Sequence, residues 1–244
     1  MKKKEILFFC ASLIILGAII ATAIVVIRNN KNNPQTKIKV KDEISGLSYS
    51  INTISEDDNV LGNPNANVVL INYSDFQCPH CREFHSTVIR LVANYSKTGD
   101  FAWVYRHFPT EEAVGKAKNS ISKKASVASE CVKEISGPTA FWDFIHEIYT
   151  SLPIDFDEAD LQTLASKMNV NQELYLSCIN SGRYDAKIQK HIEDGLAISK
   201  KDKDFGTPYN IFITRDGRQI ILPGPQSYTT LNELVRIYST TIRR

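Results

Sequence analysis

A four-residue motif, Cys78-Pro79-His80-Cys81, restricts the fold of this chain of 244 residues more than any other feature. Apolar, largely β-branched residues at 68–73 precede the motif and predict a buried strand. Helix-forming residues at 82–95 follow it. We therefore predict that a strand leads directly into a helix, with Cys78 at the start of that helix.

The start of a helix favours a cysteine thiolate, because the N–H groups of the first turn have no intrahelical partner and the helix dipole adds partial positive charge. Pro79 suits the first helical position, since its missing N–H would be unpaired there. His80 adds a donor and, when protonated, a positive charge near the sulfur of Cys78. We predict that Cys78 is the outer nucleophile and Cys81 the inner resolving thiol. Because a stabilised thiolate favours the reduced form, the oxidised pair should pass on its disulfide readily.

Two other structures share the CxxC spacing: half of a zinc site and a buried, inert disulfide. A structural zinc site needs a second pair of ligands, but Cys10, Cys131 and Cys178 are scattered singly along the chain. We therefore predict a redox pair with no metal and no cofactor. The inert disulfide stays open at this point, because spacing does not establish exposure.

The N-terminus carries three lysines and then an uncharged apolar run at 6–27. As a helix this run would be about 33 Å long, enough to span a bilayer. A cleaved signal peptide is the alternative, with Ala21 and Ala23 as a small-x-small site, but the apolar run continues beyond it. We predict a signal anchor or transmembrane helix at 1–28, a polar tether at 29–59 and a folded domain at 60–244.

The number of cysteines, rather than the charges beside the apolar run, indicates the cellular compartment in which the domain lies. Lysine and arginine flank the apolar run on both sides, which leaves its orientation open under the positive-inside rule. Four cysteines, an even number, follow the run, and this suits an oxidising compartment. We expect a single-pass protein of the cell membrane with an extracytoplasmic catalytic domain. A net charge of +2 without a basic stripe gives no indication of nucleic-acid binding.

Periodicity in the domain changes from strand to helix and back. A second strand is expected at 101–108, ended by Pro109, and helical patterns run from about 111 to 204. Strands at 209–214 and 219–222 flank a tight-turn signal, Asp216-Gly217, and Ser227 is a plausible cap for a closing helix. This order predicts an α/β fold in which a βαβ unit and a ββα unit are separated by a helical insertion.

Four motifs together resemble the DsbA-like thiol:disulfide oxidoreductases of the thioredoxin superfamily. They are CPHC after a strand, YRHFP at the end of the next strand, FWDFIHEIY in the helical block and GTPYNIFI before the hairpin. The resemblance implies a thioredoxin fold with an inserted helical domain, and a cis bond between Thr207 and Pro208 beside the CPHC pair. Thr207 and Pro208 are therefore substrate-binding candidates, since free backbone groups there could pair with an extended substrate. An ordinary turn before a strand is the alternative for Thr207.

One position departs from the family pattern. Thioredoxin-like proteins often carry a buried acidic residue six positions before the first cysteine, and here Asn72 occupies that position. Asp75 is the only nearby carboxylate in the segment, so it is a possible proton relay to the inner thiol. We favour a structural role for Asp75, because such side chains commonly brace their own backbone at strand ends.

Two cysteines and four histidines remain outside the motif. With CPHC taking one pair, Cys131 and Cys178 are the exported cysteines left over, and we favour a structural disulfide between them. Two separate buried free thiols are the alternative. The histidines show no metal spacing and no carboxylate in register, which predicts surface or packing roles for His85, His107, His146 and His191.

These features predict an extracytoplasmic enzyme that introduces disulfides into reduced exported polypeptides through Cys78 and Cys81. Turnover needs reoxidation, and the resemblance implies a membrane partner of the DsbB or vitamin K epoxide reductase type. Three alternatives stay open: a membrane-tethered reductase or isomerase, a non-catalytic peptide-binding or chaperone module, and a copper- or zinc-binding domain.

Overall fold

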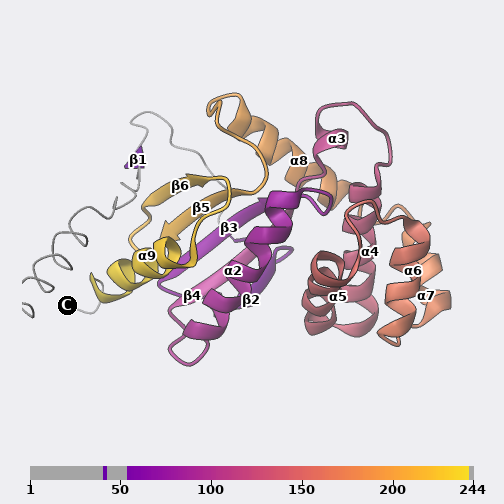
Figure 1. Cartoon of the computed structure of the whole chain (residues 1–244), viewed down its shortest axis with the longest axis horizontal. Helices are drawn as coiled ribbons and strands as arrows, with labels where there is room; N and C mark the ends of the chain where they lie inside the picture. The colour runs from indigo at the N-terminus through magenta and orange to yellow at the C-terminus, as the bar shows by residue number, and fades with distance from the viewer. Residues whose placement is uncertain (1–40, 43–53, 242–244) are drawn as a thin grey trace, which may run out of the picture. The chain divides into compact units, whose positions relative to one another are not determined.

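A mixed sheet of six strands lies at the centre of the described part of the chain, residues 41–42 and 54–241 of a computed structural model (Figure 1). The strand order is β1-β6-β5-β3-β4-β2, in which β3 and β4 are parallel and the other neighbours antiparallel. The strands are β1 (Lys41–Asp42), β2 (Asn59–Gly62), β3 (Val68–Ser74), β4 (Phe101–His107), β5 (Tyr209–Thr214) and β6 (Gln219–Pro223).

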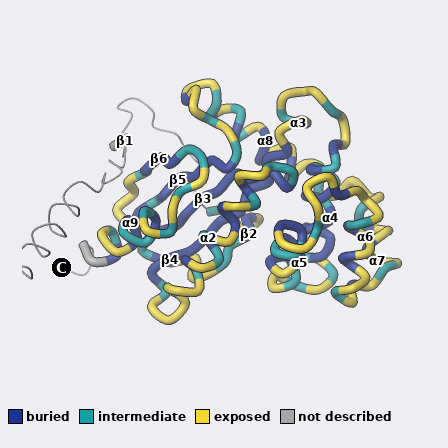
Figure 2. Tube along the Cα trace, viewed as in Figure 1, coloured by how far each residue is buried: buried dark blue, intermediate teal, exposed yellow. Residues whose placement is uncertain are grey.

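Every residue of the central strands β3 and β4 is buried, because helices cover both faces of the sheet (Figure 2). Alternate side chains contribute to two apolar clusters, with Val68 and Leu70 in one and Val69 and Ile71 in the other. This alternation fixes the register of β3, and with it the position at which the strand ends, Ser74.

Helices α2 and α9 pack together on the first of these faces, and the end of α8 contributes Ile198 to the second. Helices α4, α5, α6 and α7 pack against one another as the inserted block (Figure 1). The helices are α2 (Pro79–Tyr95), α3 (Thr110–Ala113), α4 (Ile121–Ser136), α5 (Pro138–Ser151), α6 (Glu158–Lys167), α7 (Gln172–Ile179), α8 (Asp185–Ser199) and α9 (Tyr228–Thr241).

The local signals in the sequence correspond to these elements. The helical insertion expected at about 111–204 contains α3 to α8, and Gly217 has a φ of +84° in the turn between β5 and β6, a conformation that favours glycine. Ser227 caps α9 by accepting a hydrogen bond from the Thr230 N–H at 3.1 Å. The fold is thus the mixed α/β, thioredoxin-like arrangement that the sequence predicts.

The boundary predicted between tether and domain differs from the structure. Lys41 and Asp42 pair with β6, β2 begins at Asn59, and Asp58 is buried beside Arg106. Polar composition assigns residues 58–59 to the tether, and their side chains are buried by partners far along the chain.

The predicted transmembrane segment and most of the tether lie outside the described residues. Within the residues described, no helix combines the length and the hydropathy needed to cross a membrane.

Candidate active site

The sulfur of Cys78 lies at the junction of three parts of the chain. Cys78 precedes the first residue of α2, Pro79, and the short loop after β3 leads into it. Its thiol donates to the backbone carbonyl of Thr207 over 3.2 Å. The Thr207–Pro208 bond is cis, as the family resemblance implies. The two substrate-binding candidates therefore lie beside the predicted nucleophile, although they are 129 residues away in sequence.

The pKa of Cys78 is lowered to about 6 from an ordinary value of 9. The largest contribution is a hydrogen bond from the thiol of Cys81, and burial partly opposes it. The side chain of Thr207 and the backbone N–H groups of Cys81 and His80 lower the pKa further, whereas the Thr207 carbonyl can accept a hydrogen bond only from the protonated thiol. At neutral pH Cys78 is therefore mainly a thiolate, which is the form of cysteine that reacts with disulfides.

His80 acts on Cys78 through its main chain. Its side chain is exposed, and the hydrogen bond that lowers the pKa of Cys78 comes from its backbone N–H. The thiolate is therefore stabilised by Cys81, by the side chain of Thr207 and by main-chain donors at the helix start.

Cys81 is 1% exposed and shows the opposite shift. Burial raises its pKa well above the ordinary value, and the hydrogen bond to Cys78 and the charge of that neighbour raise it further. Two donors oppose this rise: the Asp75 N–H, 3.5 Å from the sulfur, and Ser74. Both cysteines are free thiols in this structure. The predicted asymmetry between an accessible thiolate and an inner thiol is therefore present in the geometry.

The carboxylate of Asp75 braces the loop before Cys78. It accepts hydrogen bonds from the backbone N–H groups of Gln77 at 2.9 Å and Thr110 at 2.7 Å, and from the hydroxyl of Ser122. These donors come from the loop itself, from α3 and from α4. The arrangement matches the structural role that we favour over a proton relay.

Asn72 occupies the position where many thioredoxin-like proteins have an acid, and it pairs with another amide. Its Nδ2 donates to Asn210 Oδ1 at 2.9 Å, and Asn210 in turn donates to the carbonyls of Leu222 and Gly224. Both asparagines are buried. This position therefore supplies an uncharged link between β3 and β5 rather than a proton acceptor.

The inserted helices make direct contact with the motif. Arg82, one residue after Cys81, donates to the carbonyls of Tyr149 at 2.6 Å and Leu152 at 2.8 Å, which lie at the end of α5. A guanidinium in this position satisfies carbonyl groups that the helix leaves unpaired, and its charge complements the helix dipole. The position of α5 is thereby tied to the redox helix α2.

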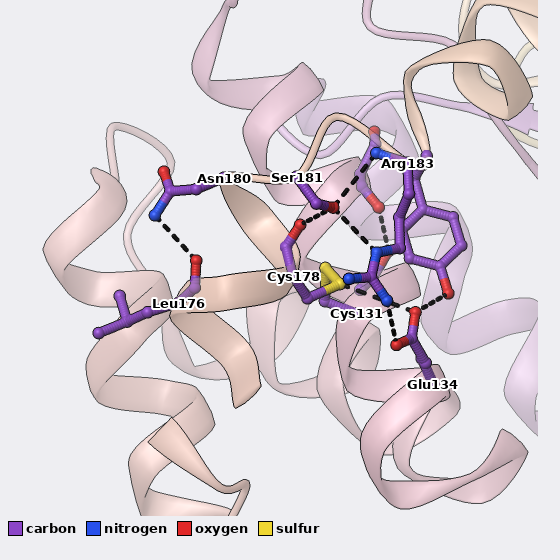
Figure 3. The surroundings of a disulfide bond; sticks show 10 residues. Cys131, Glu134, Leu176, Cys178, Asn180, Ser181 and Arg183 are labelled. Atoms are coloured by element: carbon purple, nitrogen blue, oxygen red, sulfur yellow. Dashed lines mark hydrogen bonds and ion pairs between the residues drawn. A yellow bond between two sulfur atoms is a disulfide. The ribbon is translucent and has the colours of Figure 1, made fainter. Parts of the chain in front are cut away.

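Cys131 in α4 and Cys178 in α7 form a disulfide (Figure 3), the pairing that we favour from the sequence. Both are buried, at 0% and 2% exposure. Beside the bond, Glu134 accepts hydrogen bonds from Arg183 and from Tyr184. This disulfide therefore links two helices of the insertion and is separate from the CPHC pair.

The prediction that the histidines lack carboxylate partners is wrong for His107. Its Nε2 lies 2.9 Å from Glu130 Oε1, and Lys187 binds the other oxygen at 2.7 Å. Burial lowers the pKa of His107, while its own hydrogen bond and Lys187 hold the pKa of Glu130 well below the usual range. No local pattern indicates this cluster, because its members come from β4, α4 and α8.

Arg106 and Asp58 were also missed by sequence reasoning. The guanidinium makes two hydrogen bonds to the carboxylate, at 3.0 Å and 2.9 Å, and both side chains are buried. Arg106 additionally donates to the hydroxyl of Tyr73 at 3.0 Å. The pair therefore ties the segment before β2 to the centre of the sheet.

A thioredoxin family model matches residues 54–208, which is more than half of the chain. Two curated relatives, each named "Putative protein-disulfide oxidoreductase", come from Rickettsia prowazekii and Rickettsia bellii. The first is 26% identical over 191 residues, covering 75% of this chain and 66% of the relative. The second is 27% identical over 176 residues, covering 71% and 63%. The chain thus spans slightly less than two thirds of these two relatives.

Two solved structures have a similar fold. The alignment with α-DsbA1 of Wolbachia pipientis has a TM-score of 0.64 at 23% identity and covers 79% of this chain and 96% of that one. The alignment with oxidised BdbD of Bacillus subtilis has a TM-score of 0.58 at 19% identity, covering 75% and 93%. At these identities the likeness concerns the fold, whereas the chemistry depends on the residues described above.

Proposed function

Because this chain belongs to the thioredoxin family and has a DsbA-like fold, we propose that it is a thiol:disulfide oxidoreductase that introduces disulfides into exported polypeptides. One observation carries the proposal: Cys78 combines a pKa of about 6 with a position at the start of helix α2, where backbone N–H groups and the Cys81 thiol donate to its sulfur. A thiolate stabilised in this way is a good leaving group, and its stabilisation favours the reduced form of the pair.

In the proposed reaction, a thiolate of the reduced polypeptide attacks the sulfur of Cys78 in the oxidised pair. A mixed disulfide forms, and a second thiolate of the polypeptide then displaces Cys78. The backbone of Thr207 is the proposed contact for the extended substrate, in the manner of an added strand. Two electrons pass from the polypeptide to the Cys78–Cys81 pair in each cycle.

Each cycle leaves the pair reduced, so the proposal includes a partner that reoxidises it. We propose a membrane enzyme of the DsbB or vitamin K epoxide reductase type for this role. The apolar run at 6–27 would hold the catalytic domain near such a partner, outside the cytoplasm. The buried Cys131–Cys178 disulfide is consistent with an oxidising compartment.

The reduction potential of the CPHC pair tests the direction of electron flow. A fragment of residues 34–244 would be equilibrated with graded glutathione buffers, and its thiols trapped and read by mass spectrometry. We expect a potential at least about 50 mV above that of the glutathione pool, as for a disulfide donor. A potential near that of thioredoxin would instead identify a reductant and refute the oxidase assignment.

The compartment is tested separately in intact cells. A membrane-impermeant maleimide should label Cys78 of the reduced full-length protein without lysis. Labelling that requires lysis would refute the extracytoplasmic assignment. Full function in cells of a variant lacking both CPHC thiols would instead support the chaperone alternative.

A further inference from the structure

Three hydroxyl groups form a buried chain beside the inner thiol. Ser74 Oγ lies 3.2 Å from the hydroxyl of Tyr149, which lies 2.8 Å from the hydroxyl of Tyr105. They come from three elements: the end of β3, the helix α5 of the insertion and the strand β4. The three side chains are almost completely buried. Ser74 immediately precedes Asp75, whose N–H lies 3.5 Å from the Cys81 sulfur, and the Ser74 hydroxyl lowers the pKa of Cys81 as a hydrogen-bond donor.

The sulfur of Cys81 needs hydrogen-bond donors at the step in which the disulfide breaks. When a substrate thiolate attacks Cys78, the bond between Cys78 and Cys81 breaks and its electron pair remains on Cys81 as a thiolate. This thiolate forms in a site that excludes water, where an uncompensated charge is costly. The donors to Cys81 that the described residues provide are the Asp75 N–H and Ser74.

Other polar side chains of this region, which could also stabilise the Cys81 thiolate, already make hydrogen bonds to other groups. Asn72 is paired with Asn210, and the carboxylate of Asp75 accepts three hydrogen bonds from its own surroundings. By contrast, the hydroxyl of Ser74 can donate to the sulfur while it accepts a hydrogen bond from Tyr149, whose one proton it shares with the Asp75 carbonyl, 3.3 Å from the same hydroxyl. Tyr105 can donate to Tyr149 in the same direction.

We propose that the Ser74 hydroxyl, oriented by Tyr149 and Tyr105, donates to the Cys81 thiolate as it leaves the Cys78–Cys81 disulfide. This inference rests on the proposed exchange reaction and adds a group that acts on its leaving atom. In this role Ser74 acts directly on a reacting sulfur, whereas Tyr149 and Tyr105 are positioning residues. The inserted helix α5 thereby takes part in the chemistry through one hydroxyl group.

The protonation states of the tyrosines agree with this role. Burial raises the pKa of both Tyr105 and Tyr149 well above the ordinary value, and the nearby Cys81 raises each further. Both phenols therefore remain neutral donors throughout the working pH range.

Atoms and charges balance across the two steps. In the first step the substrate sulfur bonds to Cys78, and Cys81 becomes a thiolate that accepts the hydrogen bond from Ser74. In the second step the other substrate thiol loses its proton and attacks the first substrate sulfur, which releases Cys78 as a thiolate. Cys81 takes up one proton, so the substrate loses two protons and two electrons, and one proton goes to solvent.

The test compares the rate and the equilibrium of exchange with glutathione. The Cys81 thiolate is present during the reaction but not in the final reduced pair, in which Cys81 is a thiol. Replacing Ser74→Ala should therefore slow reduction of the oxidised protein about 10-fold, which corresponds to one lost hydrogen bond to a charged group. The equilibrium constant with glutathione should change less than about twofold, because reduction and reoxidation slow together.

Three further variants separate this role from a structural one. Ser74→Thr keeps the hydroxyl and should restore most of the rate. Tyr149→Phe should slow exchange about threefold, and the Ser74→Ala/Tyr149→Phe double variant should be no slower than Ser74→Ala alone, because both act through one hydrogen bond. Ser129→Ala is the matched control, since it removes a buried serine hydroxyl that donates to the Ser126 carbonyl within α4.

The outcomes distinguish this inference from the proposed function. If the wild type exchanges normally and Ser74→Ala exchanges at the same rate, the role of Ser74 is overturned, while the proposed function stands. Equal slowing in Ser129→Ala would overturn it as well, because the effect would then be structural. No exchange by the wild type would refute the proposed function and this inference together.

Discussion

At the scale of single residues, the pKa values of two cysteines in one motif are shifted in opposite directions, because their surroundings differ. Cys78 receives hydrogen bonds at the start of a helix, and its pKa is lowered to about 6. Cys81, one turn further on, is buried in the core, and its pKa is raised well above the ordinary value. Their hydrogen bond couples the two, because the proton on Cys81 is what stabilises the charge on Cys78.

The first prediction follows from that coupling. Replacing Cys81→Ala removes the largest contribution to the lowered pKa of Cys78, so the pKa should rise by about one unit. Thiolate ultraviolet absorbance as a function of pH measures it. Cys81→Ser is the matched control, because its hydroxyl can still donate. An unchanged titration in Cys81→Ala would show that the helix start alone stabilises the thiolate.

The second prediction concerns the pH dependence of stability. The folded pKa of Cys78 is depressed from 9 to about 6, so its contribution is fully present above pH 9 and is lost as the pH falls through about 6. The oxidised protein has no such group. The free energy of unfolding of the reduced protein, relative to the oxidised one, should therefore rise between about pH 6 and 9. Denaturant titrations of both forms measure this difference, and a flat difference would contradict the assigned pKa.

At the scale of elements, the inserted helices do more than enlarge the domain. Arg82 joins the redox helix α2 to the end of α5, and Ser122 of α4 holds Asp75 in the loop before Cys78. The insertion is itself held by the disulfide between α4 and α7. Rigid supports of this kind keep reacting groups in place.

The third prediction concerns this disulfide. The Cys131→Ala/Cys178→Ala variant should lose about 2–4 kcal/mol of the free energy of unfolding, because the bond closes a loop between residues 47 positions apart. Exchange by the CPHC pair should persist, since the bond lies away from those thiols. Chemical denaturation and a glutathione exchange assay measure the two effects. Lost exchange at unchanged stability would mean that the second disulfide takes part in the reaction.

Elements with a strong local signal could be predicted from the sequence, and pairings between distant residues could not. The β-branched run at 68–73, the CPHC helix start and the Asp216-Gly217 turn each determine their structure within a few residues. Ser74 and Tyr149 gave no such signal, because a serine at a strand end and a tyrosine in an apolar helix are both ordinary. Their meeting depends on how α5 packs against β3, which local periodicity does not encode.

At the scale of the whole domain, clusters of buried charged and polar side chains join segments that are far apart in sequence. Asp58 lies before β2, Arg106 in β4 and His191 in α8, with 3.9 Å between His191 Nε2 and the Asp58 carboxylate. Next to them, Glu130 of α4 binds His107 and Lys187. Removing one member of such a cluster lowers the free energy of unfolding, because its buried partner loses a compensating group. The stability of each segment therefore depends on the others.

The fourth prediction tests this dependence with adjacent aspartates. Asp58→Asn should lower the free energy of unfolding by about 3 kcal/mol, because it removes the buried carboxylate charge that makes two hydrogen bonds to the Arg106 guanidinium. Asp57→Asn is the matched control; Asp57 is exposed, so the change should stay within about 0.5 kcal/mol. Denaturant unfolding of both full-length variants measures the difference, and equal effects would contradict the role of the pair.

The hydrogen bond between Cys78 and Thr207 also has a consequence for biosynthesis. The ribosome makes the CPHC segment early, but Thr207 follows 129 residues later. A nascent chain therefore carries two cysteines without the carbonyl that faces the outer sulfur and, until α5 is made, without Tyr149. During that interval the motif lacks two of the groups that later lie beside it. The site is therefore complete only when most of the polypeptide has been synthesised.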